Sequence, residues 1–175
     1  MLTESADRGA AFTGTKKGDV FEADSFVSGG TYLPTLNLSD ELDGGAGKDT
    51  LNITSDDTAV AAGYKMADAT IKNIETITIK GANHVTADVS GSNITGLETI
   101  SVLKSVDATV TAAATTDVNV SGASGDIVVN DGKNVVVEDA TVGTDITVNG
   151  AVGTITVTDT KNAKAAGTND IKIDG

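Results

Sequence analysis

The chain has 175 residues, of which 25 are acidic and 12 basic, and its net charge of −13 argues against nucleic acid and anionic membrane surfaces as partners. Cysteine is absent, which excludes disulfides and thiolate metal sites, and no apolar run reaches the roughly 18 residues that span a membrane. Aromatic residues make up 3% of the sequence, which disfavours a carbohydrate-stacking platform, so cations are the natural counterpart of this acidic chain.

The chain opens with a polar segment, residues 1–11, which has no clear hydrophobic period and lacks the apolar run of a secretory signal. We interpret it as a leader or linker, with a short helix over 2–11 as an option. Three further parts are expected: a calcium-binding segment at 12–58, a helix or loop connection at 59–72, and β-solenoid repeats at 73–175.

An acidic, glycine-rich turn stands out in the first half of the chain. Residues 44–52 fit the nonapeptide G-G-x-G-x-D-x-U-x, where U is a large apolar residue, with Asp49 at the sixth position and Leu51 at the eighth. Residues 14–22 fit the same template with Asp19 at the sixth position, but lack its second and fourth glycines. Sites of this type form between stacked turns, so we expect Asp19 and Asp49 to lie in register on neighbouring coils.

Such a turn suits Ca²⁺, because glycine lets carbonyl oxygens point inward and aspartate adds a carboxylate. Ca²⁺ takes six to eight oxygens at about 2.3–2.6 Å, more than one nonapeptide supplies. The alternative is a solvated β-turn in which the glycines serve backbone geometry alone. The predicted ligands are the side chains of Asp19 and Asp49 and the carbonyls of Gly45 and Gly47, with support from Asp24, Asp40 or Asp43.

The segments around this turn are less regular. Residues 25–41 contain the only proline, Pro34, and an apolar alternation over 32–38, which predicts a hairpin-like insertion or an extra strand. Residues 59–69 are compatible with a short helix or a long loop. After them, residues 73–79 resemble residues 96–102 at a separation of 23, which suits one coil of a β-solenoid.

Short alternating strands recur through the second half, each preceded by a polar residue and separated by glycines that permit sharp corners. The form D-I-x-V occurs at 126–129 and 145–148, and the other strands vary it. The predicted strands are 117–120, 126–129, 134–137, 145–148, 154–157 and 170–173.

Two all-β architectures fit this pattern. An antiparallel β-sandwich also has short strands at this spacing, and Asn149-Gly150 and Asp131-Gly132 are typical of its hairpins. A right-handed parallel β-helix stacks like residues on successive coils, so small apolar residues fill its narrow interior. The scarcity of aromatics, the polar entry residue and the 23-residue repeat favour the parallel β-helix, or β-solenoid, with calcium turns near the N-terminus.

With these residues established, the chain resembles the self-assembling surface-layer (S-layer) proteins of Gram-negative bacteria, whose lattice regions carry RTX-type calcium turns. The resemblance rests on residues 14–21 and 38–53, continues with Ile74-Glu75-Thr76-Ile77, and extends in composition from about residue 12 to 175. It implies type I secretion without a cleaved N-terminal signal, Ca²⁺-dependent ordering, and a two-dimensional lattice at the extracellular cell surface. Where many RTX proteins carry long tandem arrays, this chain has one good nonapeptide and one degenerate copy.

The expected function is therefore structural, with other copies of the chain as lattice partners and lipopolysaccharide as a further partner. A calcium-stabilised segment of a large secreted RTX adhesin or exoprotein is the alternative. An enzyme is not expected: the sole histidine, His84, has no serine or cysteine partner at motif spacing and is predicted at a surface or corner, and the lysines are scattered. Residues 122–126 lack the lysine and the helix of a phosphate-binding loop and predict a corner between strands.

Overall fold

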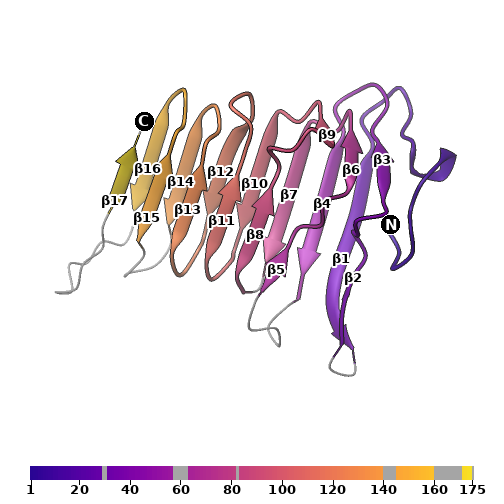
Figure 1. Ribbon diagram of the computed structural model, residues 1–175, viewed down its shortest axis with the longest axis horizontal. Helices are drawn as coiled ribbons and strands as arrows, with labels where there is room; N and C mark the ends of the chain where they lie inside the picture. Colours follow the sequence, from indigo (N-terminus) through magenta and orange to yellow (C-terminus); the bar gives the residue numbers. More distant parts are fainter. Residues whose placement is uncertain (29–30, 57–62, 82, 140–144, 160–170, 175) are drawn as a thin grey trace.

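The computed structural model describes residues 1–28, 31–56, 63–81, 83–139, 145–159 and 171–174, and its strands wind into a parallel β-solenoid (Figure 1). The strands form three sheets, which we call the long sheet, the six-stranded sheet and the three-stranded sheet. The long sheet contains, in chain order, β1 (Val20–Ser28), β2 (Thr31–Pro34), β4 (Thr50–Ser55), β7 (Thr76–Gly81), β10 (Thr99–Leu103), β12 (Asp117–Ser121), β14 (Val135–Asp139) and β16 (Ile155–Asp159).

The other two sheets complete the coils. The six-stranded sheet contains β5 (Tyr64–Lys65), β8 (Val85–Asp88), β11 (Ala108–Thr111), β13 (Ile127–Asn130), β15 (Ile146–Asn149) and β17 (Ile171–Asp174). The three-stranded sheet contains β3 (Glu41–Asp43), β6 (Thr70–Lys72) and β9 (Ile94–Thr95). The chain passes from sheet to sheet in turn, so strands that are neighbours in a sheet come from successive coils.

Every described strand pair except β1–β2 is parallel, so the antiparallel sandwich is wrong. The Asn-Gly and Asp-Gly pairs that are typical of sandwich hairpins lie instead at coil corners, where Asp131 and Gly150 adopt positive φ angles of 60° and 70°. The solenoid predicted from the sequence is confirmed, as is its 23-residue repeat: Thr76 pairs with Thr99. The predicted hairpin also exists, because β2 lies antiparallel to β1 at the end of the long sheet.

The core consists of aliphatic columns, because parallel register places inward residues of successive coils on top of one another. In the long sheet one column runs Leu51, Ile77, Ile100, Val118 and Val135, all of which are fully buried. The six-stranded sheet supplies the facing columns, which include Val85, Ala108, Ile127 and Ile146. The column that contains Val85 begins with the buried Tyr64, and aliphatic residues fill it on the coils that follow.

The coils shorten along the solenoid. Thirty residues separate the paired residues Val20 and Thr50, whereas 18 separate Thr99 and Asp117. The three-stranded sheet ends at β9, and beyond it the described coils have two strands each. The solenoid is therefore three-sided near the N-terminus and two-sided afterwards.

In the described parts of the two segments for which a short helix was one option, the structure has almost no helix. Within residues 2–11 the structure has only the start of a three-residue 3₁₀ helix, η1 (Ala10–Phe12), since the preceding residues extend over the first coil: Leu2 is buried and its N–H donates to the carbonyl of Glu22 at 2.7 Å. Residues 63–69 contain the strand β5 and no helix, while 59–62 lie outside the described residues.

Candidate cation site at the glycine turns

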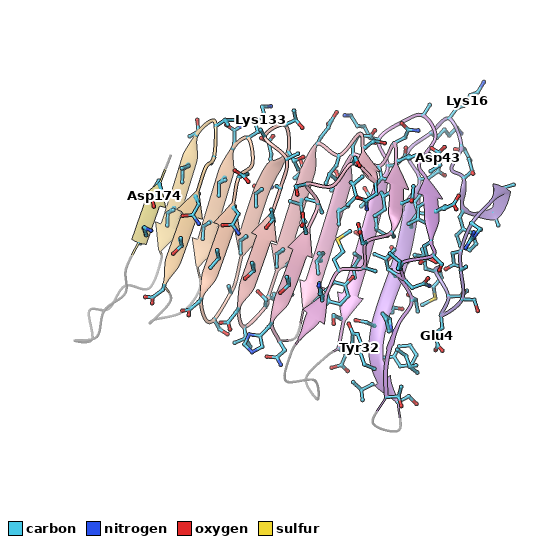
Figure 2. The ribbon with its side chains drawn as sticks, viewed as in Figure 1. Glu4, Lys16, Tyr32, Asp43, Lys133 and Asp174 are labelled. Atoms are coloured by element: carbon cyan, nitrogen blue, oxygen red, sulfur yellow. The ribbon has the colours of Figure 1, made fainter. Side chains whose placement is uncertain are left out.

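Four turns lead into the first four parallel strands of the long sheet, and we number them by coil. Turn 1 is residues 14–19, turn 2 is 44–49, turn 3 is 73–75 and turn 4 is 96–98; they precede β1, β4, β7 and β10. In Figure 2, Lys16 of turn 1 and Asp43, directly before turn 2, lie at the same corner of the N-terminal coils. The turns therefore form a stack along one edge of the solenoid.

Turns 1 and 2 pack in the register expected from the sequence. The N–H of Gly14 donates to the carbonyl of Asp43 at 2.7 Å, and the N–H of Ala46 to the carbonyl of Thr15 at 3.0 Å. The N–H of Asp19 donates to Oδ1 of Asp49 at 2.7 Å. Glycine is required at residue 45, where φ is +87° and a Cβ atom would collide with the carbonyl oxygen of Thr15.

Asp19 closes its own turn. Its Oδ2 atom accepts the N–H of Thr15 at 2.6 Å and the hydroxyl of Thr15 at 2.8 Å. Asp19 is half-buried. This oxygen already has the hydrogen bonds that a turn-closing aspartate needs.

Asp49 occupies the equivalent position of turn 2 in a different environment. It is 1% exposed, its Oδ1 accepts from Asp19, and its N–H donates to Oε2 of Glu75 at 2.7 Å. Its Oδ2 is buried and has no hydrogen-bond partner. The reason is local: residue 45 is glycine, which has no hydroxyl, and its N–H donates to Oδ1 of Asp43 at 3.0 Å instead.

Gly44 brings a second oxygen to the same place. A Cβ atom on Gly44 would collide with the carbonyl oxygen of Asn73 and would lie 2.7 Å from Oδ2 of Asp49, so both oxygens face one side of the Gly44 Cα. An orphaned, buried carboxylate oxygen next to a backbone carbonyl fits a hard cation such as Ca²⁺. Left unpaired, a buried polar atom costs about 1–3 kcal/mol or more if charged.

Asp43, directly before turn 2, forms hydrogen bonds that fix the shape of that turn. Its Oδ1 accepts the side-chain N–H of Asn73 at 2.8 Å as well as the N–H of Gly45, and these hydrogen bonds, that from Asn73 first, lower its pKa. Asn73 has a φ of +51°, in the left-handed region that asparagine tolerates. The Asp43–Asn73 bond therefore ties turn 2 to turn 3.

The other two predicted ligands lie elsewhere. Asp24 is in β1, five residues past Asp19 and so roughly 16 Å along the strand. Asp40 precedes β3 and is 1% exposed; its oxygens accept the N–H groups of Asp7 and Asn37, each at 2.8 Å. Burial raises the pKa of Asp40. The structure thus gathers Asp19, Asp43, Gly45, Gly47 and Asp49 at the turns and separates Asp24 and Asp40 from them.

Sequence reasoning missed Asn73 and Glu75 of turn 3. A signal was present: Asp49-Thr-Leu-Asn-Ile, Glu75-Thr-Ile-Thr-Ile and Glu98-Thr-Ile-Ser-Val share an acid, a threonine and two alternating aliphatics. This alignment places the three acids on successive coils, because Thr50, Thr76 and Thr99 are in register. Within the described ranges no group of three or more His, Cys, Asp or Glu residues could hold a metal ion, so carbonyl oxygens are needed to complete a site.

A second acidic column lies along the six-stranded sheet. The N–H of Asp126 donates to Oδ1 of Asp107 at 2.8 Å, and the N–H of Asp145 to Oδ1 of Asp126 at 3.3 Å. His84, the corner residue before β8, pairs through Nδ1 with Asp107. These side chains join neighbouring coils.

Among the described residues, no helix has the length and apolar character needed to cross a membrane. Comparison of the chain with protein-family models and with curated proteins finds no match.

Proposed function

We propose that this chain is a structural segment of a calcium-dependent, self-assembling bacterial surface layer, located outside the cell. The observation that carries the proposal is the stack of glycine turns with the buried, unpartnered Oδ2 of Asp49. Calcium bound there would give that oxygen a partner and join neighbouring coils.

The charge of the chain supports dependence on a cation. Its net charge of −13 opposes compaction, and acids recur at one corner of successive coils as Asp19, Asp49, Glu75 and Glu98. A divalent cation at this corner offsets that repulsion. In a calcium-poor cytoplasm the turns stay loose, and in a calcium-rich medium they order after export.

The shape of the solenoid supports assembly. Its outward strand faces carry threonine, serine and asparagine, as in the column Asn52, Thr78, Ser101 and Asn119 of the long sheet. The last described coil also exposes apolar side chains: Ile173 is 49% exposed, whereas Val148, its partner in β15, is fully buried. These surfaces suit contacts with other β-structures.

The test is a titration of the chain with Ca²⁺, followed by chelation. Circular dichroism reports folding, because the chain has no tryptophan, while light scattering and electron microscopy report assembly. We expect Ca²⁺ to raise the unfolding midpoint and to produce two-dimensional sheets, and Mg²⁺ to do neither. If neither Ca²⁺ nor the chelator changes the unfolding midpoint or the assembly state, the proposal is refuted. A chain that gains stability with Ca²⁺ but stays monomeric would favour the adhesin segment instead.

A further inference from the structure

We infer that the calcium site lies between turns 2 and 3, with Asn73 and Glu75 supplying its second half, and not between the two nonapeptides. This inference rests on the proposed function, since it takes Ca²⁺ as the ligand. It differs from what the sequence pattern indicates, because turn 3 has no nonapeptide and is only three residues long. Turn 1 then serves to hold turn 2 in place.

The two aspartates at the sixth position differ in the state of their Oδ2 atoms. In turn 1, Thr15 donates both its N–H and its hydroxyl to Oδ2 of Asp19. In turn 2, Oδ2 of Asp49 is buried without a partner. A cation therefore displaces no hydrogen bond at Asp49, whereas at Asp19 it must compete with two.

The free oxygen of Asp49 points toward turn 3. It shares one face of the Gly44 Cα with the carbonyl oxygen of Asn73. No donor among the described residues bonds to that carbonyl. Asn73 is fixed in its left-handed conformation by two bonds: its N–H donates to the carbonyl of Thr95 at 2.9 Å and its amide to Oδ1 of Asp43 at 2.8 Å. Its carbonyl is therefore held in a fixed direction.

Glu75 adds the second negative charge. Its Oε2 accepts the N–H of Asp49 at 2.7 Å, so it both fixes the backbone of Asp49 and brings a carboxylate next to it. The nearby ammonium of Lys48 is bound by Glu98, with Nζ 2.6 Å from each carboxylate oxygen. Glu75 is thus a positioning residue for Asp49 whose charge also favours the cation. Water would complete the coordination shell.

The experiment compares four variants by calorimetric titration with CaCl₂, with circular dichroism to measure the stability of the calcium-free proteins. Asp49→Asn removes the central ligand. Glu75→Gln keeps an oxygen that can accept the Asp49 N–H but removes the charge. Asp19→Asn tests the nonapeptide partner, and Glu98→Gln is the matched control for loss of one acid at the same corner.

We expect Asp49→Asn to abolish binding and Glu75→Gln to weaken it by about tenfold or more at nearly unchanged calcium-free stability. We expect Asp19→Asn and Glu98→Gln to stay within about threefold of the wild type. A loss of affinity in Asp19→Asn equal to or larger than that in Glu75→Gln overturns the inference, and so does a Glu75→Gln variant with wild-type affinity. Wild-type protein that binds no calcium refutes the proposed function itself, which is a different result.

Discussion

The substitution Gly44→Ala tests the candidate site most directly. Gly44 is buried, and its N–H donates to the carbonyl of Lys72 at 2.9 Å, so its backbone has little freedom to move. A Cβ atom there would collide with the carbonyl oxygen of Asn73 and would reach Oδ2 of Asp49 at 2.7 Å. One methyl group would therefore fill the space between the two oxygens proposed to face the cation.

Two effects are expected, and they separate by calcium concentration. Without calcium, overpacking against backbone costs about 1–3 kcal/mol of unfolding free energy. With calcium, the variant also loses the stabilisation from binding, which is about 2.7 kcal/mol at a concentration of roughly 100 times the dissociation constant. The difference in unfolding free energy between wild type and variant should therefore grow about two- to fourfold when calcium is added.

The assay is urea unfolding followed by circular dichroism, in chelator and in calcium. Gly122→Ala is the control: Gly122 also sits at a corner, with φ +68°, but a Cβ atom there has its nearest neighbours at 3.7 Å and is on a coil beyond the acidic turns. It should lose stability through backbone strain and keep the wild-type response to calcium. If Gly44→Ala gains as much stability from calcium as the wild type, the reasoning about this site is refuted.

Three further predictions follow from the coil geometry. Ile77→Ala should lose about 2–5 kcal/mol of unfolding free energy, because Ile77 is fully buried. Thr78→Ala, on the outward face of the same strand, should change the unfolding free energy by less than about 0.5 kcal/mol. Equal urea midpoints for the two variants would contradict the assigned faces. Burial raises the pKa of Asp40 above its ordinary value of 3.8, so the carboxyl group stabilises the fold most when it is protonated, in acid. The difference in unfolding free energy between wild type and Asp40→Asn should therefore narrow as the pH rises through the raised pKa. A difference that widens with pH in urea titrations would contradict this. The hydrogen bond and the charge of Glu98 raise the pKa of Lys48, with which Glu98 forms an ion pair. Lys48→Met leaves the Glu98 carboxylate without that ammonium, so the unfolding midpoint should become more sensitive to chelator. An unchanged chelator response would count against a role for this pair.

The sequence was sufficient to predict the fold because a parallel solenoid repeats its environment. Each coil places one residue of a column on the same residue of the last, so Ile77 and Ile100, or Val118 and Val135, must be alike in size and polarity. That repetition is visible along the chain as recurrent short strands. The alignment of Asp19 with Asp49 could be predicted for the same reason.

The site was harder to predict because its parts differ in ways that no repeat shows. Thr15 and Gly45 occupy the same place in turns 1 and 2, yet one satisfies an aspartate oxygen and the other leaves it unpaired. Asp40 fits a ligand pattern but is taken up by the N–H groups of Asp7 and Asn37, contacts that span up to 33 residues. Whether an aspartate oxygen is paired or unpaired thus depends on its neighbours in the folded chain.

The change from three-sided to two-sided coils has a consequence for length. Beyond β9 the paired strands of the long sheet are 17–20 residues apart, as from Val118 to Val135 and from Val135 to Ile155. Each such coil advances the rod by one strand spacing, about 4.8 Å. Duplication or loss of one coil would therefore alter the reach of the molecule by a fixed step and leave the acidic turns untouched. The number of two-sided coils, each 17–20 residues long, therefore sets the length of this part of the molecule.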